Sequence, residues 1–195
     1  MDLLTYSVLL LSFTGLALAD LSKQYDNMES LSPEYKLYWK VDVARKRIYL
    51  GVEAQTTGWV ALGFANKIGQ MDGYDVGMGY VLNDATAELQ DCHTTGYRTP
   101  PVDTTQSLVL GNFSEVNGTT TLQYFRPLDT NDQQDIAIKE GPMHVVWAYS
   151  DADNVNQKHT RKGYKTITLM GGVGTIGGLG GTLLLFACLS VWLSQ

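Results

Sequence analysis

The segment LYWKVDVARKRIYLGVEAQTTGWVALGFANKIGQMDGYDVGMGYV, residues 37–81, decides the fold of this chain. Its apolar residues recur at every second position, as Leu37 and Trp39 do, and not at the spacing of a helix. This alternation is typical of half-buried β-strands, whose side chains point to opposite faces in turn. Turn residues such as Thr57-Gly58 and Asn66-Lys67 separate the runs. The segment therefore predicts several short strands joined by turns.

The same pattern continues almost to the end of the chain. Further strand-like runs are TAELQDCHTT, LVLGNFSEV, TTLQYFRPL, MHVVWAYS and GYKTITL. Asn117-Gly118 between two of them is a strong hairpin signal, because both residues tolerate positive φ. Many short strands at this spacing predict an all-β fold, an immunoglobulin-like antiparallel β-sandwich over residues 35–169. Residues 20–34 are then an N-terminal extension.

The first 19 residues have the features of a secretory signal peptide. An apolar run covers residues 8–18. Ala17 and Ala19, at its end, form an A-x-A pattern that predicts cleavage after Ala19. The alternative is an uncleaved anchor. We expect the sandwich to enter the secretory pathway and to face the lumen or the cell surface.

Residues 170–193 form a hydrophobic membrane anchor in this interpretation. The run is long enough for a transmembrane helix. The pairs Gly174/Gly178 and Gly177/Gly181 have the spacing at which membrane helices approach closely, which favours self-association. A glycosylphosphatidylinositol signal, with its short apolar tail after small residues, is the other possibility.

Two N-x-[ST] sequons suit an extracytoplasmic chain. They are Asn112-Phe113-Ser114 and Asn117-Gly118-Thr119, both in a polar region between two predicted strands. We therefore predict glycosylation at Asn112 and Asn117.

The formal net charge of -6 argues against a nucleic-acid partner, which requires a basic face. The two cysteines, Cys92 and Cys188, lie in the globular part and in the apolar C-terminal run, so no disulfide between them is expected. Cys92 is then a free thiol or pairs with another chain.

Motifs for hydrolytic or phosphoryl-transfer chemistry are absent from the sequence, which has no nucleophile elbow, Walker loop or H-E-x-x-H. The three histidines, His93, His144 and His159, are too few and too scattered for a multi-histidine copper or zinc centre. His144 alternates with strand residues and is predicted to be a hydrogen-bonded histidine of a sheet. We expect no enzyme activity from this chain alone.

Residues 37–81 resemble the DOMON domain, above all the form found in dopamine β-monooxygenase and monooxygenase-X proteins. The segment LQYFRPLDTNDQQDIAIKEGPMHVVWAYS resembles the second half of the same domain. The resemblance implies a β-sandwich that binds haem or sugars. The copper monooxygenase domains of those proteins are not found in this sequence.

In haem-binding DOMON domains the iron is held by one methionine and one histidine. The resemblance places Met71 at the methionine position and His159 at the histidine position, with haem b as the cofactor. The structural alternatives are a turn residue for Met71 and a solvated basic patch for His159. Five aromatic residues are candidates for lining the pocket, which we expect between the sheets: Trp59, Phe64, Tyr74, Trp147 and Tyr149.

Two functions follow from the resemblance. The first is a membrane-tethered cytochrome module that exchanges electrons with a redox protein partner. The second is a haem-free module that binds a carbohydrate ligand or serves in adhesion.

Overall fold

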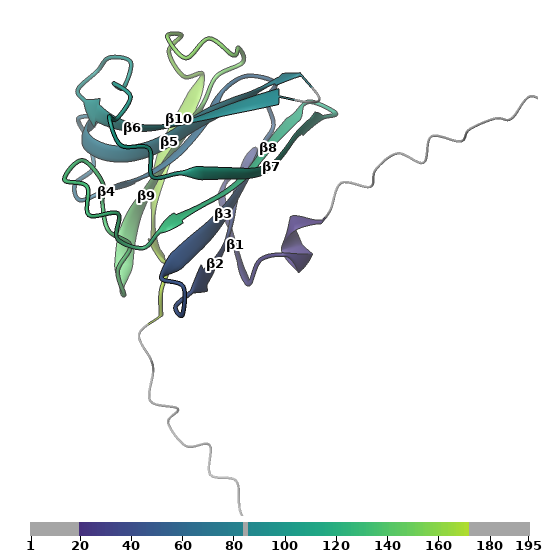
Figure 1. Ribbon diagram of the computed structural model, residues 1–195. Helices are drawn as coiled ribbons and strands as arrows, with labels where there is room; N and C mark the ends of the chain where they lie inside the picture. The colour runs from purple at the N-terminus through teal and green to yellow at the C-terminus, as the bar shows by residue number, and fades with distance from the viewer. Residues whose placement is uncertain (1–19, 84–85, 172–195) are drawn as a thin grey trace, which may run out of the picture.

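The computed structural model describes residues 20–83 and 86–171, in which two five-stranded antiparallel sheets pack face to face (Figure 1). The first sheet contains, in spatial order, β1 (Asn27–Ser32), β2 (Tyr35–Asp42), β3 (Arg47–Ala54), β8 (Thr119–Pro127) and β7 (Val109–Val116). The second contains β10 (Arg161–Thr168), β9 (Pro142–Tyr149), β4 (Val60–Ala65), β5 (Asp72–Asn83) and β6 (Thr86–Thr95). The described residues contain no helix beyond the single 3-10 turn η1 (Leu21–Lys23).

The predicted β-sandwich is confirmed. Strand β6 has the bounds of the predicted run TAELQDCHTT. Strand β1 lies in the segment predicted as an N-terminal extension, and its residues pair along β2, from Asn27 with Trp39 to Ser32 with Tyr35. The extension is therefore part of the sandwich.

The predicted signal peptide (residues 1–19) and most of the predicted membrane anchor (residues 170–193) lie outside the described residues. In the described ranges, 20–83 and 86–171, no helix is long and apolar enough to span a bilayer.

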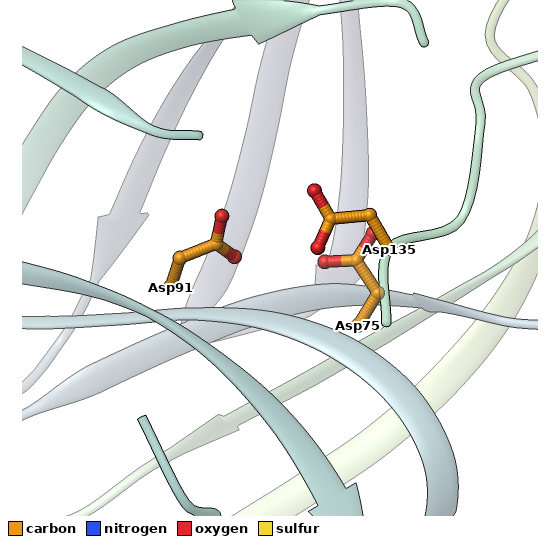
Figure 2. Close-up of side chains that lie close together, drawn as sticks. All are labelled: Asp75, Asp91 and Asp135. Atoms are coloured by element: carbon orange, nitrogen blue, oxygen red, sulfur yellow. The ribbon is translucent and has the colours of Figure 1, made fainter. Parts of the chain in front are cut away.

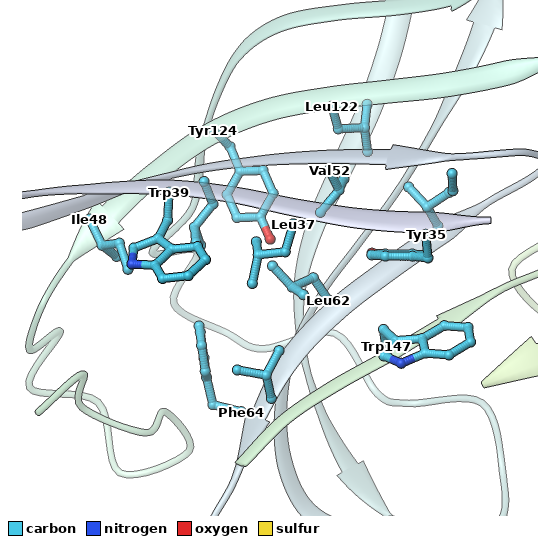
Figure 3. Close-up of a cluster of buried hydrophobic side chains, with 14 of the residues drawn as sticks. Tyr35, Leu37, Trp39, Ile48, Val52, Leu62, Phe64, Leu122, Tyr124 and Trp147 are labelled. Atoms are coloured by element: carbon cyan, nitrogen blue, oxygen red, sulfur yellow. The ribbon is translucent and has the colours of Figure 1, made fainter. Parts of the chain in front are cut away.

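The core between the sheets consists of inward-facing side chains from both layers (Figure 3). Tyr35 on β2 and Trp147 on β9 meet across the core with ring centroids 5.3 Å apart. The Tyr35 hydroxyl donates to the carbonyl of Ala61 at 2.9 Å, and the indole of Trp39, another core residue, donates to the carbonyl of Leu169 at 3.0 Å. Aromatic side chains with a bonded polar atom combine a large buried area with a fixed orientation. The core thus fixes the two sheets against each other.

Candidate functional site

A cavity of about 920 Å³ lies on the outer face of the second sheet. Side chains on β4, β5 and β9 alternate between the core and this outer face. Ala61 and Ala148 are paired across β4 and β9, so two methyl groups stand where larger side chains would fill the hollow. The outward-facing residues that form the floor are Ala61, Tyr74, Val76, Met78, Val146 and Ala148. The sequence led us to expect a pocket between the sheets, and this expectation is wrong, because the core fills that space.

Three connections supply the walls of the cavity: the β4–β5 loop, the turn after β6 and the β9–β10 loop. Trp59 fixes the last of them. Its buried indole lies at the cavity and donates a hydrogen bond to the carbonyl of Gln157 at 3.2 Å. The cavity is therefore built on a rigid sheet and bounded by loops that are tied to it.

Met71 lines this cavity from the β4–β5 loop. Its backbone has φ of 50°, a left-handed conformation that residues other than glycine seldom adopt. Its carbonyl accepts a hydrogen bond from the backbone N–H of Gly96 at 2.7 Å. The methionine that the resemblance singled out is thus held in an unusual conformation at the cavity wall.

His159 lines the same cavity from the β9–β10 loop. Partial burial lowers the pKa of His159, and the ammonium groups of Lys162 and Lys158 lower it further. The imidazole is then neutral at pH 7 and keeps a lone pair for a metal. The structure therefore brings Met71 and His159, far apart in the sequence, to one cavity.

Positive charge collects at the cavity. Arg98, Lys158 and Lys162 line it, and no Asp or Glu does so among the described residues. The guanidinium of Arg98 is fixed by two hydrogen bonds to the carbonyl of Thr95, at 3.1 and 3.2 Å. On a chain of net charge -6 this cluster favours an anionic group at the mouth.

The five aromatic candidates do not share one face of the second sheet. Trp59 and Tyr74 line the cavity on its outer face. Phe64, Trp147 and Tyr149 belong to the core between the sheets, although Trp147 also borders the cavity. The alternation of side chains along a strand does not by itself show which face of the sheet carries the cavity.

The other two histidines lie away from the cavity. His144 on β9 contacts the hydroxyl of Thr166 on β10 through Nδ1 at 3.0 Å, which confirms the hydrogen-bonded sheet histidine. His93 on β6 contacts the buried carboxylate of Asp103 and the side chain of Gln134.

A buried ionic cluster, which no pattern in the sequence predicts, lies between the sheets. Asp75, Asp91 and Asp135 bring carboxylate oxygens within 4.8 Å of one another (Figure 2). Arg126 on β8 is buried with them and donates to Asp75 at 2.6 Å. The side chain of Asp75 is buried in the cluster, where it pairs with Arg126 and does not shape the neighbouring turn.

Cys92 is a buried free thiol beside this cluster. Burial raises the pKa of Cys92 to about 12, and the charges of Asp103 and Asp91 add to the effect. Because the thiolate is the reactive form, we expect iodoacetamide at neutral pH to leave Cys92 unmodified in the native protein and to modify it in urea. Mass spectrometry of the Cys92 peptide measures this. Rapid modification in the native protein would contradict the burial of this thiol.

Both predicted glycosylation sites are exposed. Asn112 lies on the edge strand β7, and Asn117 occupies the β7–β8 turn with φ of 52°. Their modification stays a prediction.

Comparison with known proteins identifies the family. The DOMON domain model matches residues 31–150. DBH-like monooxygenase protein 2 of Mus musculus is 31% identical over 126 residues, which cover 64% of this chain and 20% of that protein. Putative DBH-like monooxygenase protein 2 of Homo sapiens is 28% identical over 134 residues, 69% of this chain and 27% of that protein. The chain thus spans about a fifth to a quarter of the length of these relatives.

Two solved structures share the fold. The cytochrome b domain of pyranose dehydrogenase from Coprinopsis cinerea matches with a TM-score of 0.56 and 12% identity, over 69% of this chain and 76% of that one. The cytochrome domain of Myriococcum thermophilum cellobiose dehydrogenase matches with a TM-score of 0.57 and 14% identity, over 74% and 82%. The sandwich, the relatives and the family match agree, and the chain belongs to the DOMON domain family.

Proposed function

We propose that this chain is an extracytoplasmic haem b-binding module that transfers single electrons. One observation carries the proposal: Met71 and His159 line the same cavity. The two solved structures that share the fold are cytochrome domains, which supports this interpretation.

The residues around the cavity fit a haem. Its volume of about 920 Å³ lies within the range of cofactor pockets, roughly 300–1,000 Å³. The apolar floor suits a porphyrin face and keeps water from it. Arg98, Lys158 and Lys162 are suited to hold the two propionates, because guanidinium and ammonium groups bind carboxylates by charge-assisted hydrogen bonds.

The two axial candidates determine which chemistry is available. Bound haem supplies a one-electron couple, and methionine with histidine raises its potential. If Met71 and His159 both held the iron, no position would be left for oxygen, and the group would supply electron transfer and not oxygen activation.

Membrane tethering and a redox protein partner complete the proposal. Membrane tethering is inferred from residues 1–19, which resemble a signal peptide, and from the apolar residues 170–193. A haem-free module that binds a carbohydrate or acts in adhesion is the alternative.

An absorption spectrum of the purified chain, expressed with haem supplied, tests the function. We expect sharp reduced bands of a six-coordinate b-type haem in the native protein, and their loss in Met71→Leu and His159→Ala. Met71→Leu nearly preserves side-chain volume, so it removes the sulfur and little else.

Matched controls come from the same sheet. Met78→Leu removes a second sulfur of the cavity floor, and His144→Ala removes a histidine outside the cavity. Both are expected to keep the six-coordinate spectrum. A flat visible spectrum in well-folded protein would rule out haem, and sugar binding would then be tested.

A further inference from the structure

The conformation of Met71 requires an explanation beyond its position at the cavity. A left-handed backbone costs a residue other than glycine on the order of 1–3 kcal/mol and persists only where the surroundings enforce it. The glycines at 69 and 73, on either side, also have positive φ, of 140° and 67°. The β4–β5 loop therefore has little intrinsic preference for the conformation that directs Met71 to the cavity.

Two tyrosine hydroxyls bind the backbone of Gly69 in this loop, one at its N–H and the other at its carbonyl. The hydroxyl of Tyr74 accepts a hydrogen bond from the Gly69 N–H at 2.8 Å. The hydroxyl of Tyr97 donates to the Gly69 carbonyl at 3.1 Å. Gly69 is exposed and nothing lies within 4 Å of the place where its Cβ would stand, so packing does not hold it. Ile68 and Met71 pack on the apolar cavity floor, while the two hydroxyls and the bond from the Gly96 N–H to the Met71 carbonyl are the hydrogen bonds that fix the backbone between them.

The two tyrosines are anchored differently. Tyr74 is buried on β5, and its backbone N–H donates to the hydroxyl of Thr94 on β6 at 2.8 Å. Tyr97 projects from the turn after β6 and is 74% exposed. A large exposed aromatic side chain gains little from burial, and its hydroxyl reaches the loop through the hydrogen bond to the Gly69 carbonyl.

We propose that Tyr74 and Tyr97 are positioning residues that fix the thioether of Met71 at the cavity. The proposal rests on the proposed function for its consequence, because a preorganised thioether pays less conformational entropy when it binds iron. A loop without these bonds would hold the same methionine over a range of orientations.

The positioning is tested first without haem, in the full chain with its methionine methyl groups labelled with 13C. Met71→Leu identifies the Met71 resonance. In Tyr74→Phe and Tyr97→Phe we expect that resonance to move towards the position of a free methionine, while the Met78 and Met143 resonances stay in place. An unchanged Met71 resonance in both variants would overturn the proposal.

Tyr164→Phe is the matched control. Tyr164 also lines the cavity and is 61% exposed, but its hydroxyl makes no hydrogen bond to the β4–β5 loop in the described residues. Removal of this hydroxyl is expected to leave the Met71 resonance unchanged. A shift as large as in Tyr97→Phe would show that any change at the mouth moves Met71, and would also overturn the proposal.

The haem-loaded chain gives a second readout. In Tyr74→Phe and in Tyr97→Phe we expect the fraction of oxidised protein in which the Met71 thioether is not bound to iron to rise about fivefold. This is the change in an equilibrium constant that the loss of one ordinary hydrogen bond produces. The absorption spectrum of the oxidised protein measures this fraction. Tyr164→Phe should leave it unchanged.

The two proposals fail in different ways. If the native chain binds no haem, the proposed function falls, and the methyl resonances alone decide whether the tyrosines position Met71. If haem binds through Met71 but the oxidised spectrum is the same in Tyr74→Phe, Tyr97→Phe and the native chain, the function stands and the positioning role is wrong.

Discussion

Replacement of Arg126 by methionine is expected to lower the free energy of unfolding by about 3–5 kcal/mol. The Arg126 side chain is 1% exposed, and it bonds Asp75 at 2.6 Å and lies 3.5 Å from Asp135. Methionine is apolar, so the substitution leaves several buried carboxylates without their cation. The cost arises from those uncompensated charges and not from lost volume. Urea denaturation of the two proteins measures the difference.

Two further variants separate charge from geometry. Arg126→Lys keeps the positive charge but loses the planar fork that reaches both carboxylates, and is expected to destabilise less than methionine. Arg45→Met removes an exposed arginine from its pair with Asp42, and such surface pairs contribute about 0–1 kcal/mol. If Arg126→Met cost no more than Arg45→Met, the buried cluster would not stabilise the fold.

The position of this cluster shows why the buried face of β5 is not predictable from the sequence. On β5 the apolar residues Tyr74, Val76 and Met78 alternate with Asp75 and two glycines. Alternation normally identifies the apolar face as the core and the polar face as solvent-exposed. In the structure the apolar face forms the cavity floor, and Asp75 points between the sheets, where Arg126 offsets its charge. Alternation of apolar residues therefore predicts the strand, but it does not predict which face of the strand packs against the other sheet.

The strands themselves were largely predictable, because their pairing requires only alternation and turns. Strand β1 was missed because its sequence, NMESLS, has little apolar alternation and its residues are exposed or half-buried. An edge strand of this kind is held by backbone hydrogen bonds to its neighbour, which leave no mark in composition.

The candidate site was predictable only in part, and through the resemblance. Met71 and His159 were selected as a pair, and the structure places both at one cavity. The cations Arg98 and Lys162 were not selected, because Arg98 comes from the turn after β6 and Lys162 from strand β10, and only the folded chain brings them together. Tyr97 was missed for the same reason.

The pH dependence of stability gives the second test of the buried cluster. Burial raises the pKa of Asp91 to about 7, against the effect of the Ser107 N–H, and the charges of Asp135 and Asp75 raise it further. One oxygen of Asp91 has no hydrogen-bond partner among the described residues, and this carboxylate lies close to those of Asp75 and Asp135 (Figure 2). The folded protein therefore favours the protonated form of Asp91, while the unfolded chain ionises it near pH 4.

The sign of the effect follows from this raised pKa. The stabilisation from protonated Asp91 is fully present below about pH 4 and is lost as the pH rises through about 7. Asp91→Asn has no proton to lose, and its amide can donate towards Asp135. We expect this variant to gain stability over the native protein between pH 4 and 7, by up to about 4 kcal/mol, since each unit of pKa difference represents about 1.4 kcal/mol.

Urea denaturation of both proteins from pH 4 to pH 8 measures the gain. Asp42→Asn is the control of opposite sign, because hydrogen bonds from Arg45 lower the pKa of Asp42 and stabilise its charged form. That variant should lose a little stability above pH 4 and gain none. Parallel curves for the native protein and Asp91→Asn would mean that Asp91 is already ionised when folded. Arg126 would then have to offset all three carboxylates, and the loss in Arg126→Met should exceed the range expected above.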